Sequence, residues 1–393
     1  MHNMIYLDNA ATTQVYREVV ETMLPFFGEV YGNPASSYRF GNRAKDAVEK
    51  ARRTLAGGIG ARPEEIYFTS GGSESDNWAL RAAADSRGRS GGHIITTQIE
   101  HHAVLNTARY LEERGICVTY LKVDQRGRVN PCDVLGAIRD DTFLISVMTA
   151  NNEIGTIQPL AEIGRIARKQ GILFHTDAVQ AFGHIPLDVE AMCIDLLSAS
   201  SHKLNGPKGV GLLYVRTGAG VGAFIHGGAQ ERSMRAGTHN VPGIVGFGKA
   251  AQLAFGHMNE RARWETELRD YLIRRIESEI PDCVLNGDRS ERLPNNVHVS
   301  IRGVDGESLL VLLDQAGICC SGGSACASGS DQPSHVLLAL GQSPGAARGA
   351  LRLTLSERTT IEEIDYTADR LREIVAKLRQ MSGGTYEKLV SEM

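Results

Sequence analysis

The sequence has no excess of basic residues, no long apolar run and only 12 prolines. Its 42 Lys and Arg against 46 Asp and Glu give a net charge of −4, so the polybasic surface of a nucleic-acid-binding protein is missing. No stretch reaches the ~20 apolar residues that cross a bilayer. The opening residues, Met1 to Asp8, carry neither a basic nor an apolar leader pattern. We therefore expect no nucleic-acid partner, no membrane partner and a cytoplasmic location.

Cysteine is also scarce and scattered. The seven cysteines are odd in number and stand at positions 117, 132, 193, 283, 319, 320 and 326. This is typical of reduced thiols and not of a disulfide framework. With 393 residues, 42% of them hydrophobic, the chain is long enough for two domains. Glycine is abundant by contrast, with 43 residues whose clusters mark candidate sites.

Short β-branched runs alternate with helical patterns between roughly residues 43 and 260. We expect strands at 65–69, 93–97, 143–147, 172–175 and 195–198, and helices at 75–84, 104–114 and 159–170. The last helix should have Pro159 at its first position. Such alternation predicts an α/β fold with a mostly parallel sheet flanked by helices on both faces. In such sheets the catalytic and ligand-binding residues lie in the loops beyond the carboxyl ends of the strands.

The pattern changes after residue 260 to that of a smaller α+β part. We expect helices at 261–279 and 307–315, strands at 294–301 and 351–355, and a closing helix with an apolar stripe from Ile361 to Leu378. Thr360 and Glu363 form a capping box at the start of that helix. The chain therefore divides into a large domain, 16–260, and a small domain made of 1–15 and 261–393.

A glycine-rich segment, Ser70 to Ser75, follows one expected strand and opens a helix. Free N–H groups at a helix N-terminus form a good phosphate cradle, although an ordinary tight turn has the same residues. The P-loop pattern is missing from the chain, and Gly218 to Ala223 imitates a dinucleotide motif without the helix or acidic residue that it needs. The phosphate and turn interpretations both remain open at this point.

Lys203 directly follows the expected strand 195–198, where it could form a Schiff base with a carbonyl cofactor. A surface lysine in a loop is the plain alternative. Asp177 favours the cofactor, because it ends a strand that would not ordinarily place a carboxylate there. A pyridoxal 5′-phosphate (PLP) site requires a phosphate cradle, an aldehyde-binding lysine and an acid facing the ring nitrogen, and all three follow expected strands.

The chain resembles the cysteine desulfurases of the NifS/IscS type, which are PLP enzymes of fold type I in the class-V aminotransferase family. The resemblance covers nearly the whole chain and rests on these segments: Tyr6 to Thr13, Gly32 to Ser36, Ser70 to Asn77, Glu100-His101, Asn151 to Gly155, Ser201 to Lys203, Met234 to Thr238, and Ser321 to His335. It implies that the large domain binds PLP and that the small domain carries a catalytic cysteine segment.

The resemblance also implies a role for each matching residue. Lys203 would carry the cofactor and remove the substrate α-proton, and His101 would stack on the ring and assist proton transfer. Asp177 would pair with the ring nitrogen and Gln180 with the ring hydroxyl. The phosphate would be held by Gly72, Ser73, Ser200 and His202, and by Thr238 of a neighbouring subunit in a homodimer. Asn152, also beside the cofactor, and Arg352 would face the substrate carboxylate, a role that suits a guanidinium.

Cys326 lies in a segment rich in Gly and Ser that cannot pack as a core, so its thiol is expected to be a nucleophile. The resemblance implies that its thiolate, formed with His101 as the base, attacks the sulfur of L-cysteine. This would leave a persulfide on Cys326 and release L-alanine. The persulfide would supply iron–sulfur cluster assembly, either general or for the nitrogenase cofactor, through a scaffold acceptor of the NifU/IscU type. Cys326 could also contact an iron–sulfur cluster as a metal ligand.

Several features depart from the family pattern or leave alternatives open. Cys320 precedes the cysteine motif and could compete as a nucleophile. Residues 355–359 differ from the family pattern just past Arg352, at the expected edge of the substrate pocket. The tail 381–393 does not match the scaffold-docking end of the housekeeping enzymes, which leaves the sulfur acceptor undetermined. Two other functions remain: another PLP enzyme of this fold, such as a selenocysteine lyase or an aminotransferase, and a non-catalytic sulfur or iron–sulfur carrier. Replacing Cys326 separates another PLP enzyme from a desulfurase. A purified protein without the yellow colour of PLP would favour the carrier.

Overall fold

A seven-stranded sheet forms the centre of the larger part of the molecule. The computed structural model describes residues 4–86, 91–322 and 333–391. The strand order is β2 (Ile66–Thr69), β8 (Gly211–Val215), β7 (Leu196–Ser200), β6 (Leu173–Asp177), β5 (Thr142–Ser146), β3 (His93–Thr97) and β4 (Cys117–Leu121). All neighbours pair in parallel except β8, which is antiparallel to β2 and to β7.

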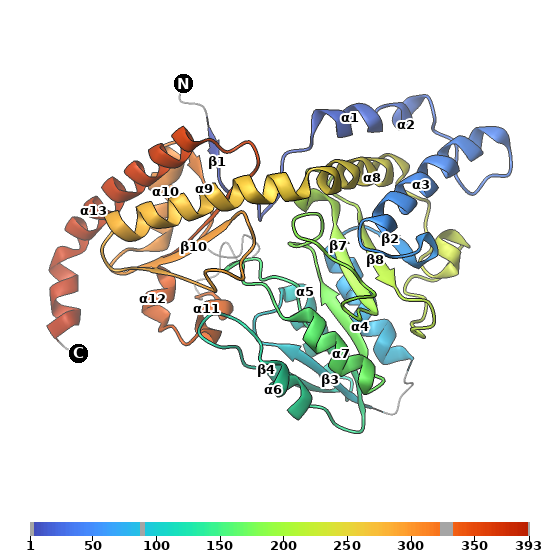
Figure 1. Cartoon of the computed structure of the whole chain (residues 1–393), viewed down its shortest axis with the longest axis horizontal. Coiled ribbons are helices and arrows are strands. Elements are labelled where there is room, and N and C mark those ends of the chain that lie inside the picture. The colour runs from blue at the N-terminus through green and yellow to red at the C-terminus, as the bar shows by residue number, and fades with distance from the viewer. Residues whose placement is uncertain (1–3, 87–90, 323–332, 392–393) are drawn as a thin grey trace.

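Helices cover both faces of this sheet because its strands are apolar on both faces (Figure 1). Successive residues of a strand point to opposite faces of the sheet and so pack into different apolar clusters. Ile94 and Leu196 belong to one cluster, and Ile95 and Leu197 to the other. The first cluster includes α4 (Gly72–Asp85) and α5 (His102–Glu112). The second includes α3 (Arg39–Gly57), α7 (Leu160–Lys169) and α8 (Val241–Gly256). The shorter helices α1 (Arg17–Met23), α2 (Pro25–Gly28) and α6 (Pro131–Gly136) lie further out.

The second part of the molecule is built on a three-stranded antiparallel sheet. Its order is β12 (Ala350–Thr354), β10 (Asn296–Ile301) and β9 (Cys283–Leu285). The helices α9 (Met258–Glu279), α10 (Gly306–Gln315) and α13 (Ile361–Ser391) pack on it around one apolar cluster. The N-terminal strand β1 (Ile5–Tyr6) joins this part by parallel pairing with β11 (Ile318–Cys319). Among the described residues, no helix is long and apolar enough to span a bilayer.

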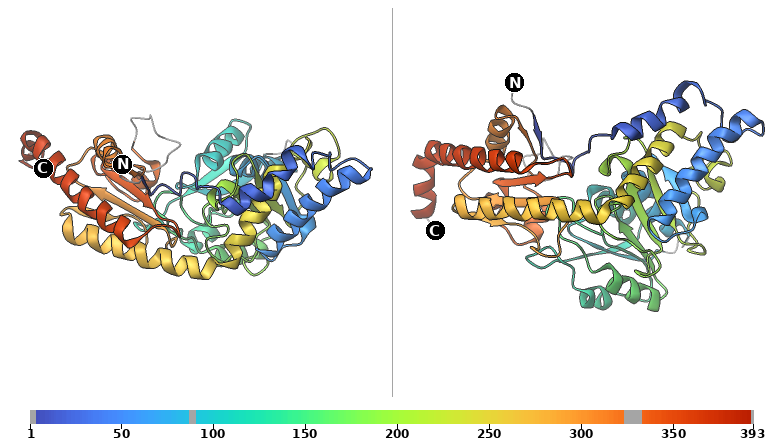
Figure 2. Two further views of the ribbon diagram at one scale, coloured as in Figure 1. Left: turned by 90° about the horizontal axis from the view of Figure 1, so that it is seen from above. Right: turned by 45° about the horizontal axis from the view of Figure 1, so that its top comes forward.

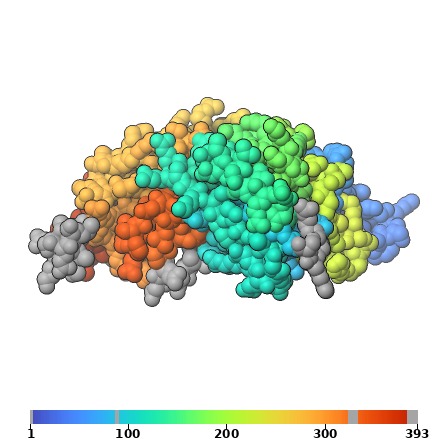
Figure 3. Space-filling model, turned by 90° about the horizontal axis from the view of Figure 1, so that it is seen from below, coloured from blue at the N-terminus to red at the C-terminus, as the bar shows by residue number. Residues whose placement is uncertain are grey.

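A chain connection and an apolar cluster help to join the two parts. α8 and α9 follow one another from the large sheet to the small one (Figures 1 and 2). An apolar cluster also joins Ile99 and Met148 of the large part to α11 (His335–Ala339) and α12 (Pro344–Arg348), where the two parts lie against each other (Figure 3). The predicted domain limits at residues 15 and 260 stay a prediction.

The expected fold class is confirmed, with differences at element ends. Pro159 is the residue before α7 and not its first position, because its ψ of 61° is not helical. The capping box is present, since Thr360 N donates to Glu363 Oε2 at 3.0 Å and Glu363 N to Thr360 Oγ1 at 3.2 Å. The strands β4 and β8 and the helices α3 and α8 were not expected from the sequence.

Candidate active site

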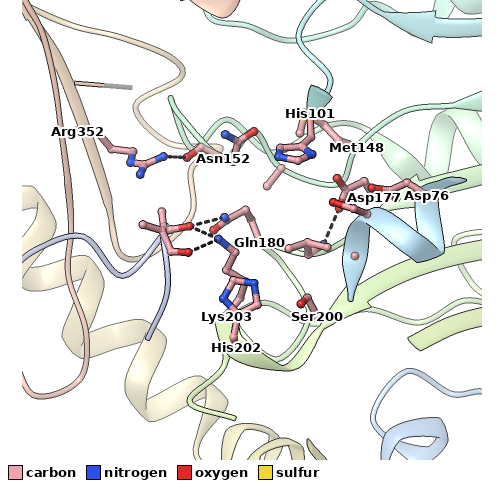
Figure 4. Close-up of a pocket in the computed structure, with 16 residues that line it drawn as sticks. Asp76, His101, Met148, Asn152, Asp177, Gln180, Ser200, His202, Lys203 and Arg352 are labelled. Carbon is pink, nitrogen blue, oxygen red and sulfur yellow. Dashed lines mark hydrogen bonds between the residues drawn. The ribbon is translucent and has the colours of Figure 1, made fainter. Parts of the chain in front are cut away.

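A cavity of about 180 Å³ lies where the strands of the large sheet end and the small part meets them (Figure 4). Ten of the predicted site residues line it: Gly72, Ser73, His101, Asn152, Asp177, Gln180, Ser200, His202, Lys203 and Arg352. They lie at or just after the carboxyl ends of β2, β3, β5, β6 and β7 of the large sheet, and Arg352 comes from the small sheet, as expected for this class of fold. The structure brings the residues together, and the role of each remains a prediction.

Lys203 closes the short helix η2 (Ser201–Lys203) that follows β7. Its Nζ donates to the carbonyl oxygen of Ala10 at 2.5 Å and to that of Ala11 at 2.7 Å. Gln180 Nε2 donates to the same Ala10 oxygen at 3.0 Å. The N-terminal segment is fixed here because Thr13 N donates to His202 O at 3.0 Å. A backbone segment from the start of the chain therefore positions the amine inside the cavity.

Asp177 is the last residue of β6 and is buried. Its Oδ1 accepts a hydrogen bond from Val179 N at 2.9 Å, which fixes the carboxyl group. Burial raises the pKa of Asp177, and His101 and Lys203 beside it counteract that rise. His101 and Lys203 therefore favour a negative charge on Asp177, against the effect of burial.

α4 presents its N-terminus to the cavity without a side-chain cap. A Cβ atom at Gly72 would lie 2.5 Å from Cγ2 of Val179, so only glycine fits at this point. Ser200 lies opposite, at the end of β7. Backbone N–H groups, a nearby hydroxyl and the helix dipole together form an anion site.

Two histidines flank this site. His101 is the N-cap of α5, and its Nδ1 accepts a hydrogen bond from Ala103 N at 3.1 Å. His202 Nδ1 lies 3.1 Å from Thr12 Oγ1. Burial, helped by the neighbouring lysines 203 and 208, lowers the pKa of His202 to about 4. At neutral pH His202 is therefore an uncharged hydrogen-bonding group.

Arg352 lies in β12 and is almost fully buried. Its Nη1 donates to Asn152 O at 2.9 Å, and its Nη2 pairs with Asp8 Oδ1 at 2.9 Å. The second oxygen of Asp8 accepts a hydrogen bond from Ser321 Oγ at 2.8 Å. Arg352 Nε is buried with no hydrogen-bond partner in the described part of the chain. An unpartnered guanidinium N–H beside a cavity suits an incoming carboxylate.

One described residue of the predicted site, Thr238, does not line the cavity. Thr238 is exposed and lies elsewhere on the surface of this chain. Cys326 lies outside the described residues. The nearest described cysteine, Cys320, is poorly suited to compete with it, because burial raises the pKa of its thiol to about 12. At neutral pH only about one Cys320 thiol in 10⁵ is then ionised.

The sequence reasoning missed several residues of the site. Ala10 and Ala11 act through backbone carbonyls, which carry no sequence signal. Asp8 becomes visible only through its pairing with Arg352. Asp76 lines the cavity as well. It lies one helical turn after Gly72, so the spacing in the glycine-rich segment could have revealed it.

The donor set fits PLP. The uncapped helix end at Gly72 suits the phosphate, the buried Asp177 suits a ring nitrogen that carries a proton, and Lys203 reaches the same cavity. One PLP molecule would therefore use the anion site, the acid and the amine together.

Comparisons with known proteins give the same assignment. A family model described as aminotransferase class-V matches residues 5–367. A cysteine desulfurase IscS from Methanosarcina thermophila is 54% identical over 378 residues, which cover 96% of this chain and 93% of that protein. Among solved structures, a NifS-like protein superposes with a TM-score of 0.89 at 41% identity, covering 95% of this chain and 99% of its own. A structure described as SspA in complex with cysteine gives a TM-score of 0.81 at 37% identity and covers 91% of this chain and 100% of its own.

Proposed function

Because this chain belongs to the class-V aminotransferase family, and within it to the cysteine desulfurases, we propose that it converts L-cysteine to L-alanine and holds the sulfur as a persulfide on Cys326. The sulfur supplies iron–sulfur cluster assembly. The observation that carries this proposal is the convergence of Lys203, Asp177 and Arg352 on one cavity. An amine, an acid for the ring nitrogen and a carboxylate-binding cation are the groups that an amino-acid substrate requires at a PLP site.

PLP, when bound, supplies an aldehyde that captures the substrate amine and a ring that withdraws the electron pair released at the α-carbon. Lys203 would hold the cofactor, Asp177 its ring nitrogen and Gln180 its hydroxyl. The N-terminus of α4 at Gly72 and Ser73 would hold the phosphate, together with Ser200 and His202.

Arg352 and Asn152 bind the substrate carboxylate in this proposal and thereby fix the α-carbon. Lys203 Nζ then takes the α-proton. The carbonyl oxygens of Ala10 and Ala11 accept from the same nitrogen, so they can hold the protonated amine in place. Positioning of a base in this way typically contributes a factor of about 10²–10⁴ to the rate.

The sulfur transfer joins the Cys326 sulfur to the substrate sulfur and breaks the substrate Cβ–S bond. The bond pair of the broken bond stays with carbon, which takes up a proton and becomes the methyl group of L-alanine. One thiol and one L-cysteine thus give one persulfide and one L-alanine, and no external oxidant is required. His101, which lines the cavity, would accept the proton of the attacking thiol.

The test is to incubate the purified holoenzyme with L-cysteine and to measure L-alanine and protein persulfide together. In a single turnover the two should form in equal amounts. Cys326→Ala should lower persulfide and alanine formation on the order of 10³-fold or more, because the nucleophile is lost. The matched control is Cys320→Ala, which should stay within about 2-fold because the Cys320 thiol is almost fully protonated.

The result separates the alternatives. A Cys326→Ala variant that still converts cysteine at the wild-type rate would contradict persulfide formation at this residue and indicate a lyase or an aminotransferase. A wild-type protein that binds no PLP would instead indicate a sulfur carrier without catalysis.

A homodimer is proposed on two observations. Large apolar side chains are exposed along the segment from α1 to the start of α3: Leu24, Phe27, Tyr31 and Tyr38, whose exposed fractions range from 59% to 73%. Exposed apolar patches of this kind mark interfaces. Thr238, the predicted phosphate ligand of a neighbouring subunit, is likewise exposed and outside this chain's own cavity.

Sedimentation equilibrium should give twice the chain mass, and Phe27→Glu should shift the measured mass toward that of the monomer. A wild-type monomer would contradict the assignment of Thr238.

The sulfur acceptor is proposed to be a scaffold protein of the NifU/IscU type, in the cytoplasm. The homology to desulfurases supports transfer to an acceptor protein. Service to nitrogenase and contact between Cys326 and a cluster are finer proposals, which rest on the resemblance of the cysteine segment. Transfer of radioactive sulfur from the persulfide to a purified scaffold protein would test the acceptor.

A further inference from the structure

Asp76 has no part in the mechanism above, although it lines the cavity. It lies in the first turns of α4, and only 1% of it is exposed. Its Oδ1 is buried and has no hydrogen-bond partner among the residues that the structure describes. A buried carboxylate with an unpartnered oxygen is costly and requires an explanation.

The surroundings of Asp76 contain a second carboxyl group at close range. One carboxylate oxygen of Asp76, one of Asp177 and one ring nitrogen of His101 all lie within 4.8 Å of one another. Figure 4 shows the three side chains at the cavity. On the other side, His175 Nε2 is 3.6 Å from Asp76 Oδ1. The two ring nitrogens of His175 contact Ser146 Oγ at 2.8 Å and Ser198 Oγ at 3.0 Å.

His175 does not neutralise Asp76, because burial lowers the pKa of its ring to about 3 and leaves it uncharged. Glu100, a further buried carboxyl, adds to the unfavourable environment of an ionised Asp76. His101 and Lys203 favour the ionised form of Asp177. Burial and the charge of Asp177 instead raise the pKa of Asp76 well above its ordinary value. Two buried carboxyl groups this close disfavour two negative charges, and these surroundings favour the proton on Asp76.

We propose that Asp76 is a positioning residue that stays protonated beside Asp177, so that Asp177 keeps its charge toward the cofactor. This inference rests on the proposed function, since it places PLP beside Asp177. The ring nitrogen then has one negatively charged partner, Asp177. Asp76, the neighbouring acid, is neutral and adds no second negative charge.

The first test is infrared spectroscopy of the holoenzyme at neutral pH. Asp76→Asn should remove one C=O band of a protonated carboxyl group. Asp85→Asn makes the same change on the exposed end of the same helix and should leave that band in place. Loss of a carboxylate band from Asp76→Asn, with the acid bands unchanged, would overturn the proposal.

The second test is the pH midpoint of the absorbance of bound PLP. Asn is neutral and still donates a hydrogen bond, so Asp76→Asn should move the midpoint by less than about 0.3 pH units. If Asp76 were ionised, its removal would destabilise the cationic form of the cofactor and lower the midpoint by about one unit or more. That result would overturn the proposal.

A third variant separates positioning from simple packing. Asp76→Leu fills the space but places no polar group beside Asp177, whose charge should then act more strongly on the cofactor. The midpoint should rise by roughly half a pH unit. If Leu and Asn behave alike, Asp76 only fills space. A wild-type protein without PLP absorbance would contradict the proposed function, while the infrared band would still decide the protonation of Asp76.

Discussion

Replacing Lys203 with alanine should abolish the formation of L-alanine from L-cysteine. The variant loses both the amine that tethers the cofactor and the base at the substrate α-carbon, so the rate should fall on the order of 10⁴-fold or more. Borohydride reduction followed by mass spectrometry should find PLP attached to residue 203 of the wild type and to no residue of the variant.

Lys208→Ala is the matched control for this experiment. Lys208 lies five residues further in the same segment but is exposed and does not line the cavity. It should keep its activity and its covalent cofactor. If the Lys203→Ala variant still carried PLP covalently, another amine would be the tether, and the assignment of the site would be wrong.

The gathering of Lys203 and Asp177 in one cavity has a simple physical basis. In a parallel sheet the carboxyl ends of neighbouring strands meet at one edge, so polar residues just after apolar strands gather in one place. The strands β3, β5, β6 and β7 are buried apolar runs that the sequence reveals directly. Asp177 and Lys203 lie close together because β6 and β7 are neighbours in the sheet.

α8 shows why other parts of the fold could not be predicted. It contains Gly243, Gly246 and Gly248, and glycine disfavours helix formation. The structure explains two of them, since a Cβ at Gly248 would lie 2.6 Å from Ala51 Cβ of α3 and one at Gly246 would lie 2.6 Å from Met23 Sδ. These glycines permit close packing between elements that are far apart in the sequence. Helix propensity depends on the local sequence and cannot reveal such a contact.

The same limit applies to Asp8. Its partner Arg352 lies 344 residues further along the chain. Either residue alone is consistent with an ordinary surface charge. Only the tertiary structure shows that 2% of the Arg352 side chain and 16% of the Asp8 side chain are exposed, which makes the pair a buried part of the site.

Arg352→Gln should raise the KM for L-cysteine roughly 100-fold, because a charge-assisted contact with the substrate carboxylate of up to about 3 kcal/mol is lost. The kcat should change much less, since this contact binds the ground state and the transition state alike. Steady-state kinetics with L-cysteine measure both constants. An unchanged KM would contradict the assignment of Arg352 to the carboxylate.

The variant also removes the ionic partner of Asp8, so its effect on stability must be separated from its effect on binding. Asp8 keeps the hydrogen bond from Ser321, and its partial exposure reduces the cost of leaving it charged. We expect Arg352→Gln to lower the free energy of unfolding by about 1–3 kcal/mol. Urea titration of the holoenzyme measures this value.

The double variant Asp8→Asn/Arg352→Gln distinguishes the two effects. Asparagine removes the unpaired charge and should restore part of the lost stability, whereas the KM should stay high because the cation for the substrate carboxylate is still missing. If the double variant instead recovered the wild-type KM, the Arg352→Gln defect would come from the uncompensated charge of Asp8. Arg352 would then be a structural partner of the N-terminal segment, and the substrate carboxylate would have to bind elsewhere in the cavity.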